Sequence, residues 1–268
     1  MNLDTPLSHF ILQVLEQPAF QIGLNTNEVT ELFCADQGKE YTDSSYKSIS
    51  RRLGQMYKAK VLQRFKPENK YCYYLNQKAL AAIRQWAHNH ELKPRPNVIN
   101  TIVHSRLGAS SIAKIVCASL RSGEIDSYFV LDGFDVEISD NEKEKKCLRP
   151  DALLQMNKQT FAIEIDANTE SKTQLEEKLI KYLIFLNREI NQEIRVLFIA
   201  THFQRTKMIF SILREIFEGF SESSVAQIAN RIYFSYPHFL DNSFQSGWVK
   251  ASIERDITTS DFITGIMQ

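Results

Sequence analysis

Apolar residues recur at helical spacing in three stretches of residues 1–60, and this pattern predicts three short helices. The first is expected to follow Asp4-Thr5-Pro6, where a capping side chain precedes a proline, and to end before Pro18. The second is expected to open at Thr26-Asn27, and Thr42 or Asp43 is expected to cap the third.

Two β-rich runs follow these helices, at residues 61–66 and 71–75, and a polar turn at 67–70 joins them. This arrangement predicts a hairpin. Three helices followed by a hairpin form a winged helix-turn-helix, which we predict for residues 1–93. A fourth amphipathic helix, from Gln77 to about His90, is expected to pack on this domain or to mediate pairing.

The predicted third helix turns Ile49, Leu53 and Met56 inward, and its outward positions carry hydroxyl, amide and basic side chains. Residues 43–70 hold eight basic side chains against two acidic ones. Such a surface suits phosphates and base edges, so duplex DNA is the expected partner. The candidate DNA-binding residues are Ser44, Lys47, Ser48, Arg51, Arg52, Gln55, Lys66 and Lys70. A basic solvent-exposed face or a protein-binding surface remains the alternative.

Lys93-Pro94-Arg95-Pro96 cannot continue a helix, so a linker is predicted there. Beyond it, residues 97–268 are predicted to form an α/β domain. The helical periods and β-rich runs give the order α-β-β-β-α-β, followed by α-β. The expected elements are a helix at 97–120, strands at 127–138, 148–156 and 160–166, a helix at 173–188, a strand at 195–200, a helix at 206–220 and a strand at 231–236.

Composition narrows the class of protein. Hydrophobic residues make up 43% of the chain, which is typical of a globular protein with a core. No apolar run is long enough to span a bilayer, residues 1–17 lack the pattern of a signal peptide, and the four cysteines lie far apart. The cytoplasm is therefore the expected compartment, and no membrane partner is expected. The glycines form no Walker loop or dinucleotide fingerprint.

Three acidic residues are expected to gather at one sheet edge in the second domain. Asp151 opens one predicted strand, and Glu164 and Asp166 lie two positions apart on its hairpin partner, so they share a strand face. Neighbouring carboxylates repel each other unless a cation or a basic side chain lies among them. Their oxygen atoms suit Mg²⁺ or Mn²⁺, which can activate water for phosphodiester cleavage. From spacing alone, capping and solvated acids remain the alternative.

The motif Pro150-Asp151 … Glu164-Ile165-Asp166, in an αβββαβ order, resembles the restriction-endonuclease-like core of the PD-(D/E)XK nucleases. A winged helix followed by RPDALLQM…FAIEIDANTES…LEEKLIKY also resembles the replication-relaxation family. That family occurs on plasmids and other mobile elements, and it includes relaxases of the C-type mobilisation group. The resemblance covers nearly the whole chain in domain order, and it is sharpest over residues 149–182.

This resemblance implies that Asp151 and Glu164 are metal ligands and that a catalytic lysine follows two positions after Glu164. This chain has Asp166 there instead. Either Asp166 acts as a further metal ligand, or a lysine from the following helix reaches back. The candidate lysines are Lys172, Lys178 and Lys181. Lys178 is favoured because the pattern at 177–182 belongs to the resemblance. Weaker candidates follow the next strand: His202, Gln204 and Arg205.

Two functions are compatible with these features. The first is Mg²⁺- or Mn²⁺-dependent nicking of one DNA strand at a mobilisation or replication origin. The second is a non-catalytic DNA-binding regulator, or a replication or transposition accessory factor, with a degenerate nuclease-like domain. A homodimer and other mobilisation, replication or transposition proteins are further partners that the resemblance allows.

Overall fold

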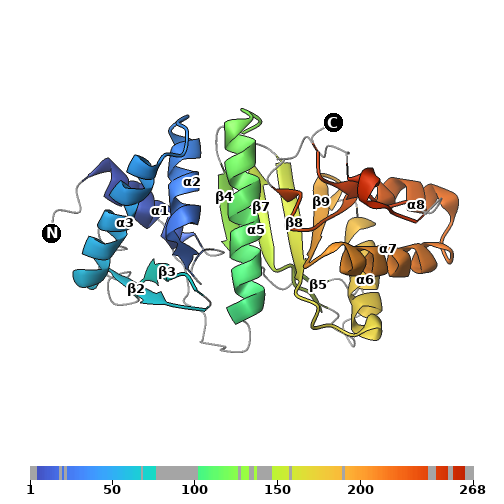
Figure 1. Ribbon diagram of the computed structural model, residues 1–268. Helices are drawn as coiled ribbons and strands as arrows, with labels where there is room; N and C mark the ends of the chain where they lie inside the picture. Colours follow the sequence, from blue (N-terminus) through green and yellow to red (C-terminus); the bar gives the residue numbers. More distant parts are fainter. Residues whose placement is uncertain are drawn as a thin grey trace. The chain divides into compact units, whose positions relative to one another are not determined.

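The computed structural model shows a mixed α/β protein that folds into two compact units, Met1–Arg121 and Ser122–Gln268 (Figure 1). The predicted fourth helix and the predicted linker lie outside the described residues, so the boundary between 1–93 and 97–268 stays a prediction. The structure describes residues 5–17, 20, 23–67, 69–76, 102–125, 128–132, 136–137, 147–156, 159–188, 191–240, 246–252 and 256–262.

The first unit contains four described helices and a small antiparallel sheet with the strand order β1-β3-β2. Its elements are α1 (Pro6–Glu16), β1 (Leu24–Asn25), α2 (Thr26–Asp36), α3 (Asp43–Lys58), β2 (Leu62–Phe65), β3 (Cys72–Leu75) and α5 (Ile102–Arg121). The three predicted helices and the hairpin are therefore present. The short strand β1 was not predicted.

Side-chain caps explain where the first three helices begin. Thr5 accepts a hydrogen bond from the N–H of Ser8, while Asn25 and Thr42 each form a reciprocal capping box with the third residue of their helix. These bonds satisfy backbone donors that a helix start leaves unpaired. The predicted inner face of α3 is fully buried.

A glycine lets β1 approach β3 closely. Gly23 has φ +101°, and a Cβ atom at this position would lie 2.9 Å from the backbone oxygen of Tyr73. A side chain is therefore excluded by both its backbone conformation and its neighbour. The Gly23 carbonyl also accepts a hydrogen bond from Arg106 of α5, and Arg106 pairs with Glu28 of α2 at 2.7 Å. These contacts join α5 to α2 within the first unit.

The second unit is built on a six-stranded mixed sheet with the order β11-β10-β9-β8-β7-β4. Strand β7 runs antiparallel to both β4 and β8, β9 and β10 continue parallel to β8, and β11 is antiparallel to β10. The strands are β4 (Tyr128–Asp132), β7 (Ala152–Met156), β8 (Gln159–Asp166), β9 (Ile194–Ala200), β10 (Ile232–Ser235) and β11 (Val249–Lys250). The remaining elements are α6 (Lys172–Leu186), α7 (Phe203–Phe217), α8 (Glu222–Ala229), the 3-10 helix Thr259–Asp261, and a two-stranded sheet of β5 (Val136–Glu137) and β6 (Cys147–Leu148).

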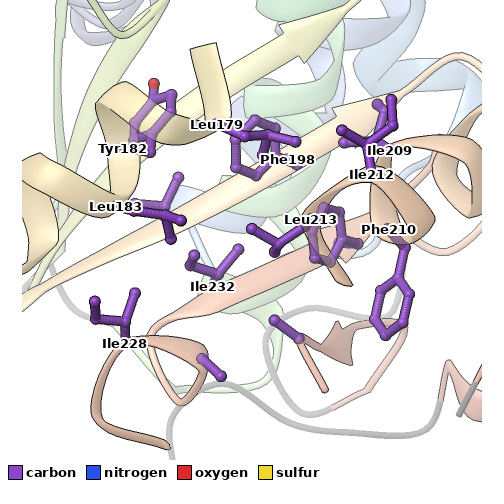
Figure 2. Close-up of a cluster of buried hydrophobic side chains, with 14 of the residues drawn as sticks. Leu179, Tyr182, Leu183, Phe198, Ile209, Phe210, Ile212, Leu213, Ile228 and Ile232 are labelled. Atoms are coloured by element: carbon purple, nitrogen blue, oxygen red, sulfur yellow. The ribbon is translucent and has the colours of Figure 1, made fainter. Parts of the chain in front are cut away.

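Helices α6 and α7 share a buried apolar cluster with the central strands (Figure 2). Phe198 of β9 stacks on Phe234 of β10 with ring centroids 5.4 Å apart, and the Tyr182 ring of α6 meets Phe198 edge-on at 5.2 Å. Figure 2 shows the Tyr182 hydroxyl pointing out of this cluster, so the ring belongs to the core while its polar end does not.

Two predicted strands are broken in the structure. The strand predicted at 148–156 is divided into β6 and β7, because Pro150 cannot donate a ladder hydrogen bond. Pairing resumes at Asp151, whose N–H donates to Ile163 O at 3.0 Å. The strand predicted at 127–138 is likewise divided into β4 and β5, which belong to different sheets. Strand β11 and helix α8 were not predicted.

Candidate functional site

Asp151 and Glu164 face each other across two antiparallel strands. The register pairs Ala152 of β7 with Ile163 of β8, which puts Asp151 opposite Glu164. Asp151 Oδ2 accepts a hydrogen bond from the N–H of Ile165 at 2.8 Å, so its carboxyl group is held against β8. The side chains of Asp151 and Glu164 interact directly. The structure therefore brings together the two carboxyl groups that the resemblance predicts as metal ligands.

Helix α6 supplies both polar partners of Glu164, whose side chain is buried. Lys178 Nζ donates to Glu164 Oε1, and the Tyr182 hydroxyl donates to Glu164 Oε2 at 2.6 Å. Lys178 and Tyr182 are four residues apart, so they lie on the same side of the helix. Lys178 also forms an ion pair with Glu170 Oε1 at 2.5 Å. A cation therefore lies beside the paired carboxyl groups.

Burial and mutual repulsion change the ionisation of this cluster. Burial, followed by the charge of Asp151, raises the pKa of Glu164 to about 8, although Lys178 and Tyr182 act in the opposite direction. Burial also raises the pKa of Asp151. Burial lowers the pKa of Lys178, but Glu164 and Glu170 outweigh that effect, and its pKa is raised overall. The carboxyl pair therefore holds a proton readily at neutral pH, as expected where two acids compete for positive charge.

Asp166, the third carboxylate predicted for the site, forms an ion pair with an arginine. Arg205 in the first turn of α7 donates from Nε to Asp166 Oδ2 and from Nη2 to Oδ1 at 3.1 Å. The N–H of Asn168 donates to Oδ1 at 2.9 Å, and Arg205 also bonds the Glu170 carbonyl at 2.7 Å. These contacts pair the charge of Asp166 within the protein and join the end of β8 to α7, and its catalytic and metal-binding roles stay predictions.

The three candidate lysines have different surroundings. Lys172 forms an exposed ion pair with Glu215 at 2.9 Å, and Lys181 is half-buried. Of the three, Lys178 is the one that contacts Glu164. The structure thus places Lys178 where a lysine reaching back from the helix should lie, although its catalytic role stays a prediction. Sequence analysis did not predict Glu170 as its second partner.

The carboxyl groups of this cluster are candidate ligands for a divalent cation. Within the described ranges, no group of three or more His, Cys, Asp or Glu side chains is arranged to hold a metal ion. Mg²⁺, however, is commonly held by one or two carboxylates, with water and substrate phosphates supplying the other ligands. Asp151 and Glu164 fit this smaller requirement, since their carboxyl groups lie next to each other on adjacent strands.

The predicted DNA-binding residues of the first unit are mostly solvent-exposed. Those exposed are Ser44, Lys47, Arg51, Gln55, Lys66 and Lys70, whereas Ser48 and Arg52 are half-buried. Arg52 is used within the unit, because its guanidinium donates to Ser8 Oγ and, at 3.1 Å, to Thr5 Oγ1 near the start of α1. Arg51, by contrast, is solvent-exposed on α3. Contact of these residues with DNA stays a prediction.

These observations define a mixed α/β protein with a basic helical unit and a second unit that carries a buried carboxylate–lysine cluster. A family model described as replication-relaxation matches residues 23–199, and the chain belongs to this family. Membership suggests a role in the replication or mobilisation of a plasmid or other mobile element. Comparisons with curated proteins and with solved structures found no match. Across the described residues, none of the helices has the length and apolar character required to cross a bilayer.

Proposed function

We propose that this protein binds duplex DNA at an origin of a plasmid or other mobile element and nicks one strand with the help of Mg²⁺ or Mn²⁺. The observation that carries this proposal is the convergence of Asp151 and Glu164 from adjacent strands, with Lys178 beside them. Buried carboxyl groups with raised pKa values next to a specific charge partner are typical of functional sites.

The first unit supports the DNA-binding half of the proposal. Helices α2 and α3 followed by the β2–β3 hairpin have the element order of a winged helix-turn-helix, with α3 as the recognition helix. Its exposed side carries Lys47, Arg51 and Gln55, which suit phosphates and base edges. The hairpin adds the exposed Lys66 and Lys70.

The second unit supports the cleavage half. Its antiparallel strands β4, β7 and β8, the helix α6 and the parallel strand β9 follow the βββαβ part of the αβββαβ order of restriction-endonuclease-like folds, and the helix α5 of the first unit precedes them in the chain. In this arrangement, Asp151 and Glu164 would hold the cation, whose chemistry would be to polarise the phosphodiester and to activate a water for attack. Tyr182 orients Glu164, and Lys178 offers positive charge to the phosphate as negative charge develops on it.

Nicking of supercoiled plasmid that carries the element's origin, in Mg²⁺ or Mn²⁺, tests the proposal. We expect Glu164→Gln and Asp151→Asn to abolish nicking while duplex binding persists. Glu177→Gln is the matched control, because Glu177 is an exposed residue on α6. Lys178→Met should reduce nicking strongly, whereas Lys181→Met, three residues further along the same helix, should not. Equal nicking by wild type and Glu164→Gln would refute the assignment.

The second function, a non-catalytic DNA-binding regulator or accessory factor, is favoured by one observation. Both oxygens of Glu164 already have donors within the protein, from Lys178 and Tyr182. On this alternative, Lys178 permanently takes the place of a metal ion and the cluster is structural. Specific duplex binding by a wild-type protein that never nicks, with either metal, would support it. Cytoplasmic location, homodimerisation and association with other mobilisation, replication or transposition proteins stay predictions under both functions.

A further inference from the structure

An arginine of the hairpin is sandwiched between two tyrosines on the surface of the first unit. The guanidinium carbon of Arg64, in β2, lies 4.3 Å from the ring centroid of Tyr57 and 4.2 Å from that of Tyr71. Lys66 Nζ lies 5.8 Å from the Tyr71 centroid. Tyr57 belongs to the last turn of α3 and Tyr71 directly precedes β3, so the stack joins the end of that helix to the hairpin.

The rings of this stack are exposed rather than part of the core. Tyr57 is 37% exposed and Tyr71 is 45% exposed, and Arg64 is exposed as well. The arginine is nevertheless held in place, because its guanidinium also bonds the side chain of Tyr73, which is buried. The two rings are therefore exposed to solvent while Arg64 holds them in place.

Positive charge surrounds the stack. Besides Arg64, four exposed lysines flank it in the sequence and in the hairpin: Lys58, Lys60, Lys66 and Lys70. Aromatic rings interleaved with basic side chains are the combination that binds single-stranded nucleic acid, because the rings stack on bases while the cations follow the phosphates. Tyr41 is exposed to a similar degree, at 39%, but lies before α3 rather than in this group.

We propose that Tyr57, Arg64 and Tyr71 form a stacking site for the bases of single-stranded DNA. The bases of an intact duplex are stacked on one another and offer no free face, so exposed tyrosines gain this contact only from nucleotides that have left the helix. The inference rests on the proposed binding of origin DNA by the first unit. It adds that this unit also binds the unpaired strand. In this scheme α3 holds the duplex and the stack holds a strand that has been separated from it.

Fluorescence anisotropy with the whole 268-residue chain tests this site. Three labelled probes are compared: oligothymidylate, an abasic strand of the same length and charge, and a duplex. Each is about 20 nucleotides long, which exceeds the usual footprint of one binding module. We expect oligothymidylate to bind about 10-fold or more tightly than the abasic strand, and Tyr71→Ala or Tyr57→Ala to remove most of this difference. Tyr71→Phe should retain it, because the ring is kept, and Tyr41→Ala serves as the matched control.

The outcomes separate this inference from the proposed function. If the abasic strand binds as well as oligothymidylate, or if Tyr71→Ala and Tyr41→Ala behave alike, the stacking site is refuted, whatever happens with the duplex. If single-strand binding depends on Tyr71 while the duplex does not bind, the site is confirmed and duplex recognition fails instead. Circular dichroism of each variant excludes loss of fold as the cause, and a Tyr71→Phe variant as weak as Tyr71→Ala would also refute stacking.

Discussion

Asp166 at the end of β8 and Arg205 in the first turn of α7 form a buried ion pair in which both carboxylate oxygens are bonded by the guanidinium. Arg205 adds a bond to the Glu170 carbonyl, so it connects β8, the loop after it and α7. A buried pair of this kind is expensive to break from one side, because the remaining charge stays desolvated.

Arg205→Ala should therefore lower the free energy of unfolding by about 3–5 kcal/mol, as measured by urea denaturation. Lys172→Ala is the control, because it breaks the exposed pair with Glu215 and should leave stability nearly unchanged. If the two variants lose similar stability, the pair does not hold β8 to α7 as we infer.

The raised pKa of Glu164 should make the free energy of unfolding decrease as pH rises. Its pKa is raised from 4.5 to about 8 in the folded state, so between these values the folded protein binds a proton that the unfolded chain has released. The stabilising effect of the neutral form is therefore complete below pH 4.5 and is lost progressively up to about pH 8. Glu164→Gln should flatten this dependence in urea titrations at several pH values, whereas Glu177→Gln should leave it as in wild type.

Divalent cations should stabilise the protein most at high pH. Metal ions bind ionised carboxylates and compete with protons, so Mn²⁺ should raise the melting temperature more at pH 8 than at pH 6. Glu164→Gln should lose this shift. Lys178→Met should enlarge it, because the competing ammonium group is gone, even though nicking is reduced. An unchanged melting temperature in both metals at both pH values would favour the non-catalytic alternative.

The adjacent residues Arg51 and Arg52 should have separable effects. Arg51→Ala should weaken duplex binding and reduce the slope of log K against log salt by about 1, without loss of stability. Arg52→Ala should instead lower stability by about 1–3 kcal/mol, because Ser8 and Thr5 lose their donor. Anisotropy over a salt series and urea denaturation measure the two effects. A stable Arg52→Ala variant that binds DNA less tightly would assign Arg52 to the interface instead.

Local signals made much of the fold predictable. The caps at Thr5 and Thr42 are side-chain bonds within one turn, so the sequence alone indicates where α1 and α3 begin. The continuous apolar run of β9 likewise predicts a strand buried on both faces. The two-residue strands β1 and β11 have no such period, and their pairing depends on distant partners.

The candidate site was predictable in part. Strand pairing makes Asp151 and Glu164 neighbours, and both had been singled out as candidate ligands. The ion pair between Asp166 and Arg205 was not predictable. Arg205 lies 39 residues further along the chain, and only the packing of α7 brings it into contact with Asp166. For Lys178 the sequence offered three lysines on one helix, and the choice among them depends on which side of α6 faces β8.

The lysine that contacts Glu164 comes from helix α6 and not from strand β8, which affects how relatives of this chain can be recognised. Lys178 of this neighbouring helix brings its positive charge to Glu164, while Asp166 of the strand pairs with Arg205. A sequence pattern that requires a lysine two positions after the glutamate would miss this chain, although the positive charge of Lys178 lies beside Glu164. Distant relatives should therefore be sought by the position of a positive group in space around the buried acid, whichever segment of the chain provides it.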